Sequence, residues 1–233
     1  MACGHETELK KSLILRIAFP ERRKIYHGNL TDREDMPFAE HTELNITVGE
    51  KMKILNLHGF MGEADNKNYK ALCGIVPAED IVSPKLAYME TSPLELLEQL
   101  SAYGDTDDII FVGQSLGGWY ADKLSRKFRR PCILTNPCYY PAELELIAAS
   151  GIPADYAEQY RRMSEYDKNE LAYTLCSDGD TVLPDNYRDC RRLSGQVMRV
   201  HGSHSTIENI GGHISELLSE IQRLNEGTPI SLA

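Results

Sequence analysis

One short stretch near the middle of the chain constrains the fold more than any other. Residues 109–112 read Ile-Ile-Phe-Val, an apolar run that is typical of a strand buried on both faces of a parallel sheet. The run leads directly into Gly113-Gln114-Ser115-Leu116-Gly117, and a helical pattern over 116–128 follows. A Gly-x-Ser-x-Gly turn between a strand and a helix is the context of a nucleophile elbow. The two glycines are expected because larger side chains would collide in so sharp a turn.

From residue 53 onward, short β-branched runs alternate with longer helical patterns, which predicts repeated βα units. Strands are predicted over 53–57, 80–83, 108–112, 132–135, 171–176 and 196–201. Helices are predicted over 68–73, 93–103, 116–128, 185–193 and 214–224. The segment 141–166 is helical in pattern but broken at Gly151-Ile152-Pro153, so we expect a minimal helical lid over about 138–168. The expected architecture is a mainly parallel sheet flanked by helices.

The first fifty residues follow a different pattern and are expected to form an N-terminal extension. Residues 13–19 and 43–48 predict two edge strands of the same domain, joined through an acidic loop over 31–40. With 42% apolar residues, a chain of 233 residues can bury one large core, so residues 51–233 are predicted to be a single catalytic domain. The tail after residue 226 is expected to fray.

The formal net charge of -10 makes nucleic acid and anionic membranes poor partners, because like charges repel. A small neutral molecule is a better expectation for the substrate. No apolar run approaches the roughly 18 residues of a membrane-spanning helix, so we expect a cytoplasmic protein. The six cysteines lack the spacing of zinc or redox sites and are expected to be buried thiols. No cofactor is expected, and a homodimer stays open.

A serine hydroxyl is a weak nucleophile near neutral pH, so Ser115 needs a base within hydrogen-bond reach and an acid that orients the base. After such an elbow the chain order is serine, acid, histidine. Asp180, in a loop just past the strand predicted over 171–176, is the preferred acid. Asp178 is the alternative, and we expect it instead to cap the turn before Gly179 by accepting amide hydrogen bonds.

His204 is the preferred base, because it follows the last predicted strand in a loop from which its ring can swing over Ser115. His201 is the alternative, but it is still close to strand geometry. Four further histidines are expected to be surface residues: His5, His27, His41 and His213.

The loop His58-Gly59-Phe60, after the first predicted strand, is expected to complete an oxyanion hole. Its donors would be the backbone amides of Phe60 and Leu116. We expect His58 to brace this loop and not to bind a metal, because no other ligand stands at a suitable spacing. The neighbouring side chains of His58, Trp119 and Tyr139 are candidates for substrate contact, with core packing as the alternative.

Several motifs together resemble those of the small bacterial YqiA-like esterases. They are Asn56-Leu57-His58-Gly59-Phe60, Gly113-Gln114-Ser115-Leu116-Gly117-Gly118-Trp119-Tyr120, Asn136-Pro137, Asp180-Thr181-Val182-Leu183 and the His204 loop. The resemblance implies an α/β hydrolase with a minimal lid that cleaves carboxylic esters, here of small to medium acyl chains. It begins near residue 53 and so supplies no role for the extension.

The same three residues serve several related reactions, so alternatives stay open. A thioesterase, an amidase or an acyltransferase would need the same serine, histidine and aspartate. A non-catalytic ligand-binding protein on a hydrolase fold would carry them without turnover.

Overall fold

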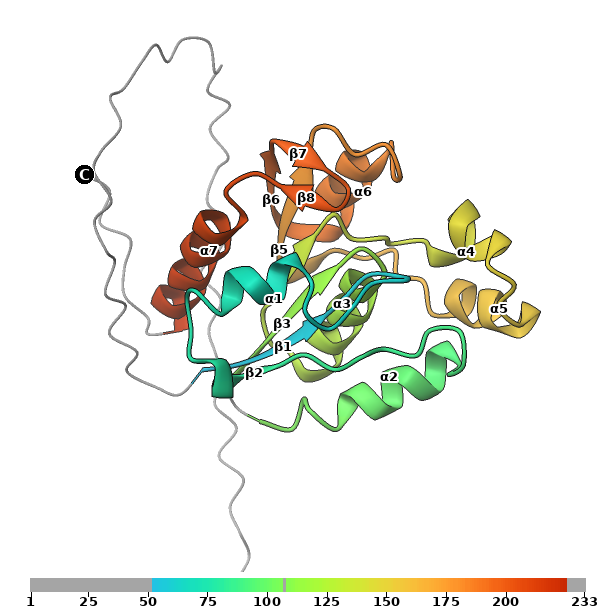
Figure 1. Ribbon diagram of the computed structural model, residues 1–233, viewed down its shortest axis with the longest axis horizontal. Helices are drawn as coiled ribbons and strands as arrows, with labels where there is room; N and C mark the ends of the chain where they lie inside the picture. The colour runs from blue at the N-terminus through green and yellow to red at the C-terminus, as the bar shows by residue number, and fades with distance from the viewer. Residues whose placement is uncertain (1–51, 107, 226–233) are drawn as a thin grey trace, which may run out of the picture. The chain divides into compact units, whose positions relative to one another are not determined.

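The computed structural model describes residues 52–106 and 108–225. Its main sheet contains β1 (Lys53–Leu57), β2 (Ile81–Val82), β3 (Ile109–Gln114), β4 (Cys132–Thr135), β5 (Asn169–Ser177) and β6 (Ser194–Val200). These six strands lie in the order β2-β1-β3-β4-β5-β6, and every neighbouring pair is parallel (Figure 1). The predicted parallel sheet is therefore confirmed. The strands expected over 13–19 and 43–48, the loop between them and the tail after 226 lie outside the described residues.

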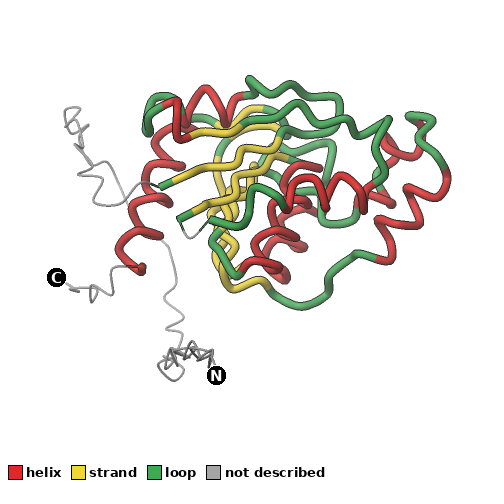
Figure 2. The backbone as a smooth tube through the Cα atoms, turned by 90° about the horizontal axis from the view of Figure 1, so that it is seen from below, coloured by secondary structure: helices red, strands yellow, loops and turns green. Residues whose placement is uncertain are grey.

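Helices cover both faces of this sheet (Figure 2). They are α1 (Lys67–Leu72), α2 (Pro93–Ser101), α3 (Leu116–Phe128), α4 (Glu145–Ala149), α5 (Ala154–Arg162), α6 (Asn186–Leu193) and α7 (Ile210–Asn225), with 3-10 turns η1 (Ala78–Asp80) and η2 (Pro141–Glu143). Helices α1 and α7 pack on one face, and α2, α3 and α6 pack on the other. Within the described part of the chain, no helix combines the length and apolar character needed to cross a bilayer.

The buried run in β3 divides between two hydrophobic clusters. Ile110 and Val112 join the cluster that includes side chains of α1 and α7, whereas Ile109 and Phe111 join the cluster that includes α2, α3 and α6. Successive side chains of a strand point to opposite faces, so a strand covered on both sides is apolar at every position. This double burial explains why residues 109–112 show no polar alternation.

The strand order places a topological switch between β1 and β3. The chain leaves β1 for β2 at one edge of the sheet, but leaves β3 for β4 on the opposite side. Loops diverge at the carboxyl ends of two such neighbouring strands and leave a crevice, which is where ligands bind in open α/β sheets. His58-Gly59-Phe60 follows β1 and Ser115 follows β3, so both candidate loops lie at the carboxyl ends of these two strands, where this rule predicts a ligand site.

A small hairpin after β6 was not predicted. Its strands β7 (Gly202–Ser203) and β8 (Thr206–Ile207) pair antiparallel and leave His204 and Ser205 at the turn. Gly202 has a φ of 148°, and a Cβ there would lie 2.2 Å from the carbonyl oxygen of Thr206. Only glycine accommodates both that backbone conformation and that close approach. The hairpin thus fixes the position of a residue that the sequence placed only in a loop.

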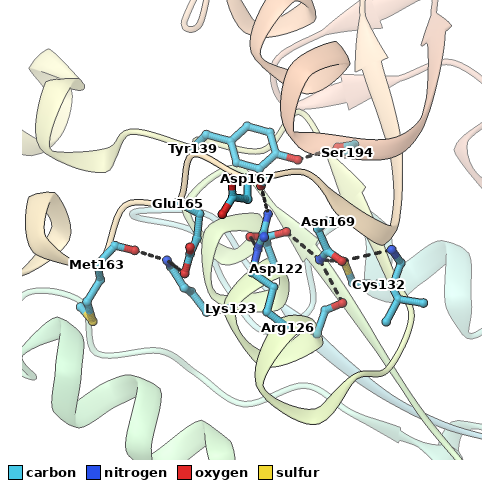
Figure 3. A network of polar contacts seen from close by, with 12 residues as sticks. Asp122, Lys123, Arg126, Cys132, Tyr139, Met163, Glu165, Asp167, Asn169 and Ser194 are labelled. Carbon is cyan, nitrogen blue, oxygen red and sulfur yellow. Dashed lines mark hydrogen bonds and ion pairs between the residues drawn. The ribbon is translucent and has the colours of Figure 1, made fainter.

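The segment predicted as a lid consists of η2, α4 and α5, with Gly151 at a φ of 80° between the two helices. Helix α5 packs against α2, where the Leu94 amide donates to Gln159 Oε1 at 3.1 Å. The chain after α5 is held on α3 (Figure 3), because Lys123 donates to Glu165 Oε1 at 2.8 Å and Arg126 to the Asp167 carbonyl oxygen at 2.8 Å. The second half of α5 and the chain that follows it are therefore anchored on the domain, and the role of this segment as a lid stays a prediction.

Asp122 lies at the centre of this polar network and is 2% exposed. Arg126 Nε donates to Asp122 Oδ2 and Asn169 Nδ2 donates to Asp122 Oδ1, each at 2.8 Å. Figure 3 shows these contacts joining α3 to the start of β5. A buried carboxylate is tolerated only when it is paired and hydrogen-bonded, and both of its oxygens meet this condition here.

Replacing Asp122 with alanine is expected to lower the free energy of unfolding by about 3 to 5 kcal/mol, because it leaves the largely buried guanidinium of Arg126 without its carboxylate partner. Urea denaturation measures this change. The matched control is Asp65→Ala, which removes an exposed ion pair to Lys70 (3.3 Å) and should cost about 1 kcal/mol or less. Equal losses in the two variants would contradict a structural role for the buried network.

Candidate active site

Ser115 occupies a strained turn between β3 and α3. Its φ is 51° and its ψ is -118°, a conformation that non-glycine residues rarely adopt. The turn is held from both sides, because the Ser115 amide donates to the Thr135 carbonyl oxygen at 3.0 Å and its own carbonyl accepts from Gly118 N (2.9 Å) and Cys138 N (3.0 Å). Strain that is fixed in this way by the surrounding structure is a common feature of functional sites.

The two glycines of the motif have a direct steric cause. A Cβ at Gly113 would lie 2.3 Å from the carbonyl oxygen of Gly117. A Cβ at Gly117 would lie 2.2 Å from the carbonyl oxygen of Leu57 and 2.4 Å from that of His58. These contacts are with backbone atoms, which cannot move without disturbing β1 and β3. The turn therefore requires glycine at both positions, as the sequence pattern indicated.

The structure brings Ser115, His204 and Asp180 into one chain of hydrogen bonds. His204 Nε2 lies 2.9 Å from Ser115 Oγ, and His204 Nδ1 lies 2.9 Å from Asp180 Oδ2. An ionised carboxylate only accepts hydrogen bonds, so Nδ1 carries the proton and the neutral ring presents Nε2 as acceptor to the serine hydroxyl. The side chains of His204 and Asp180 are 12% and 3% exposed. This is the geometry that activates a serine nucleophile.

Asp180 is fixed by more than the histidine. Its Oδ1 accepts from the amides of Val182 (3.0 Å) and Leu183 (2.9 Å), and its Oδ2 accepts from Asn186 Nδ2 at 3.4 Å. Burial alone raises the pKa of the carboxyl, but the hydrogen bonds from His204 and from the two amides outweigh it and leave the pKa lowered. Asp180 therefore stays ionised near neutral pH. No pattern in the sequence indicated the Asn186 contact, which depends on where α6 begins.

The two alternative residues, Asp178 and His201, pair with each other. Asp178 Oδ2 lies 2.6 Å from His201 Nδ1, and Asp178 Oδ1 accepts from the Gly202 amide at 3.3 Å. The His201 side chain is 83% exposed. The expectation that Asp178 caps the turn is wrong, because its carboxylate points back to the end of β6. Asp180 caps its own turn instead, while its other oxygen meets His204.

The loop after β1 lies against the candidate nucleophile, since a Cβ at Gly59 would be 3.1 Å from Ser115 Cβ. The Gly59 carbonyl accepts from His58 Nδ1 (2.8 Å) and from the Gly62 amide (2.9 Å). This carbonyl and the Phe60 N–H belong to one trans peptide, so fixing the carbonyl also fixes the direction of the amide. Leu116 supplies the first amide of α3, where the helix dipole favours negative charge.

His58 braces this loop through both ring nitrogens. Its Nε2 accepts from the Leu86 amide at 2.9 Å while its Nδ1 donates to the Gly59 carbonyl. Burial lowers the pKa of the ring, which suits a neutral structural histidine. Among the described residues, no group of three or more histidine, cysteine or acidic side chains is arranged to hold a metal ion.

A pocket of about 350 Å³ lies between the loop after β4 and the loop after β5. Its lining combines apolar side chains with carboxylates and includes Pro137, Tyr139, Leu144, Leu183, Glu143 and Asp185. Of the three side chains predicted to contact substrate, Tyr139 borders this pocket, although its hydroxyl is paired with Ser194 Oγ at 2.6 Å. Trp119 is buried against the rings of Tyr120 and Tyr160, which favours core packing, as does the burial of His58.

Comparison with known proteins places this arrangement in a wider group. Over residues 53–181, more than half of the chain, the sequence matches the protein family described as "Uncharacterised protein family (UPF0227)". The matched segment contains Ser115 and Asp180 and ends before His204.

Three solved structures illustrate the likeness in fold. An α/β hydrolase enzyme, MGS-MChE2, from a sediment metagenome of the Mar Chica lagoon, Morocco, is 19% identical with a TM-score of 0.56, covering 76% of this chain and 93% of that one. Est1E from Butyrivibrio proteoclasticus is 13% identical with a TM-score of 0.56, covering 73% and 88%. The type II thioesterase BorB of the borrelidin biosynthetic cluster is 16% identical with a TM-score of 0.51, covering 73% and 91%. These similarities show the α/β-hydrolase fold.

Proposed function

The chain belongs to the UPF0227 family and has the α/β-hydrolase fold, and from this premise we propose that it is a serine hydrolase that cleaves carboxylic esters. One observation carries the proposal: the hydrogen bonds that run without a break from Ser115 Oγ through His204 to Asp180. A buried serine has no structural need for an imidazole that is itself oriented by a carboxylate. Such a chain of contacts is what nucleophilic catalysis requires.

In the first half of the reaction, Ser115 Oγ attacks the ester carbonyl carbon while its proton passes to His204 Nε2. The positive ring that results is stabilised by the ionised Asp180 at 2.9 Å. The carbonyl oxygen gains negative charge, which the amides of Phe60 and Leu116 would stabilise. The C–O bond to the alcohol then breaks, and the alcohol leaves with the proton from His204. Ser115 is left as an acyl ester.

In the second half, water takes the place of the alcohol. His204 accepts a proton from the water as its oxygen attacks the acyl carbon, and the same two amides hold the oxyanion. The bond to Ser115 Oγ then breaks, the serine recovers its proton from His204, and the carboxylic acid is released. Every proton in this cycle passes to or from His204, so the proposal includes no cofactor.

The pocket beside the site supports small to medium acyl chains as substrates. Its volume of about 350 Å³ can hold a group of that size, and Leu144 and Leu183 offer apolar surface to a hydrocarbon chain among the polar side chains of the lining. A neutral ester also fits the formal net charge of -10 better than an anionic one. We propose that the protein is located in the cytoplasm. Light scattering in solution tests whether the chain forms a homodimer.

Hydrolysis of nitrophenyl esters across a series of acyl lengths, together with labelling by a fluorophosphonate, tests the proposal. We expect turnover that is highest for short and medium chains, and a covalent label on Ser115. Turnover confined to long chains would contradict the proposed substrate size. Labelling without any turnover would favour a binding protein that has kept the site.

The choice between the two aspartates is tested by a matched pair of variants. Asp180→Asn keeps Oδ1 as acceptor for the amides of Val182 and Leu183, but presents an amide group to His204 and favours the wrong tautomer. We expect kcat to fall by about ten-thousandfold. Asp178→Asn alters an exposed pair and should change kcat by less than about threefold. Equal effects in steady-state assays of the two variants would contradict the assignment.

A further inference from the structure

Asn136, directly after β4, connects three loops of the site. The residue is fully buried and adopts a φ of 44°. Its Oδ1 accepts from the Ser177 amide at 2.7 Å, and its Nδ2 donates to Ser177 Oγ (2.8 Å) and to the carbonyl oxygens of Ser203 (3.1 Å) and His204 (3.0 Å). We propose that Asn136 is a positioning residue in the hydrolysis proposed above: it holds the turn that carries His204 against the loop that carries Asp180.

The contacts of Asn136 reach both the segment that leads to Asp180 and the turn that carries His204. Ser177 is the last residue of β5 and stands three positions before Asp180, whereas Ser203 and His204 belong to the turn that carries the base. One side-chain amide therefore fixes the distance between the two loops. It does so through their backbones and touches none of the reacting atoms.

The segment around Asn136 also holds the nucleophile. Its neighbour Thr135 accepts from the Ser115 amide at 3.0 Å, and Cys138 donates to the Ser115 carbonyl at 3.0 Å. The chain from 135 to 138 thus contacts all three loops that carry Ser115, Asp180 and His204. A shift in this segment would change the 2.9 Å contact between His204 Nε2 and Ser115 Oγ.

Asparagine suits this position for two chemical reasons. The carboxamide has one acceptor oxygen and two N–H donors, so it can bond an amide on one side and carbonyl or hydroxyl oxygens on the other. Asparagine also tolerates a left-handed backbone better than most residues with a side chain. Aspartate has nearly the same shape, but it would set a carboxylate oxygen against the carbonyl oxygens of Ser203 and His204.

Asn136→Asp is therefore the sharpest test. Misplacing a catalytic group by about 1 Å can cost a hundredfold in rate, so we expect kcat to fall by about a hundredfold while KM changes by less than about twofold. The rate of fluorophosphonate labelling should fall in parallel with kcat. A control is Asn209→Asp, at another left-handed asparagine (φ 48°) that is exposed, and it should leave both rates unchanged.

A double variant separates positioning from general stability. If Asn136 acts through His204, then Asn136→Asp in a His204→Ala background should lower the residual rate by less than about twofold, since the base it positions is gone. A hundredfold loss in both backgrounds would overturn the proposal. So would an unchanged kcat in the single variant, or a loss confined to KM.

Thermal melting decides whether these rates describe folded protein. If Asn136→Asp melts below the assay temperature, Asn136→Gly takes its place, because it buries no charge and keeps the left-handed backbone. Failure of both variants to fold would overturn a specific positioning role. The labelling rate also separates the two proposals: wild-type labelling without ester turnover would reject the ester hydrolase, while the ratio of labelling rates would still test Asn136. A wild-type chain that does not label would overturn both.

Discussion

Ser115→Ala is expected to lower kcat for ester hydrolysis by about a millionfold, which is the loss that removal of the nucleophile causes in a comparable serine–histidine–aspartate site. The reason is chemical, because the alanine methyl group offers no oxygen to attack the ester and no proton for His204 to accept. Steady-state assays with a nitrophenyl ester, run at high enzyme concentration, measure the residual rate. The fluorophosphonate label should be absent from the variant.

The variant also separates catalysis from binding. The residues that line the pocket beside the site include neither Ser115 nor His204, so affinity for the carboxylic acid product should change little. Ser205→Ala, at an exposed serine in the turn next to the base, is the control and should keep the wild-type rate. A Ser115→Ala enzyme that still turns over more than a small fraction of the wild-type rate would mean that another group is the nucleophile.

The parts of this structure that the sequence predicted are those that leave a continuous local pattern of residues. The buried run over 109–112 reflects cover on both faces, Gly113 reflects a collision with the carbonyl of Gly117, and Gly117 reflects a collision with the end of β1. The bounds of β1, α3 and β4 agree with the predictions residue for residue. In each case a residue pattern in one stretch of chain records the surroundings of that stretch, even where the neighbours that cause it are distant in sequence.

Other features depend on residues that are distant in sequence. The hairpin β7–β8 has two residues in each strand, too few to show a periodic pattern. Asn136 was visible only as part of an Asn-Pro pair that ends a strand, yet its partners lie 41 to 68 positions away. Its role depends on the packing of three loops, and no local pattern encodes that packing.

The two Asp–His pairs show where sequence spacing stops being informative. Asp178 and His201 are 23 positions apart, and Asp180 and His204 are 24 apart, so both pairings are equally plausible from spacing. The hairpin decides between them. Gly202 allows the chain to fold back closely, which places His204 at the turn above Ser115 and leaves His201 at the end of β6 in solvent.

His204→Ala is expected to lower kcat by about a millionfold, as far as Ser115→Ala. The serine and the histidine act as a unit, so losing either one disables the other. Without the imidazole, the serine keeps its proton and Asp180 loses the group it orients. Alanine keeps the backbone carbonyl that accepts from Asn136, so the hairpin should stay in place. Thermal melting checks this, and steady-state assays measure the rate.

The matched variant is His201→Ala, which removes the other candidate base. His201 pairs with Asp178 in solvent, and exposed ion pairs contribute little, so kcat should change by less than about twofold and the melting temperature only slightly. Comparing the two histidines tests the geometry directly. They are three positions apart, but the His204 ring contacts Ser115 and Asp180, whereas the His201 ring contacts Asp178 and is exposed to solvent. A large loss for His201→Ala with a small loss for His204→Ala would reverse the assignment of the base and, with it, that of the acid.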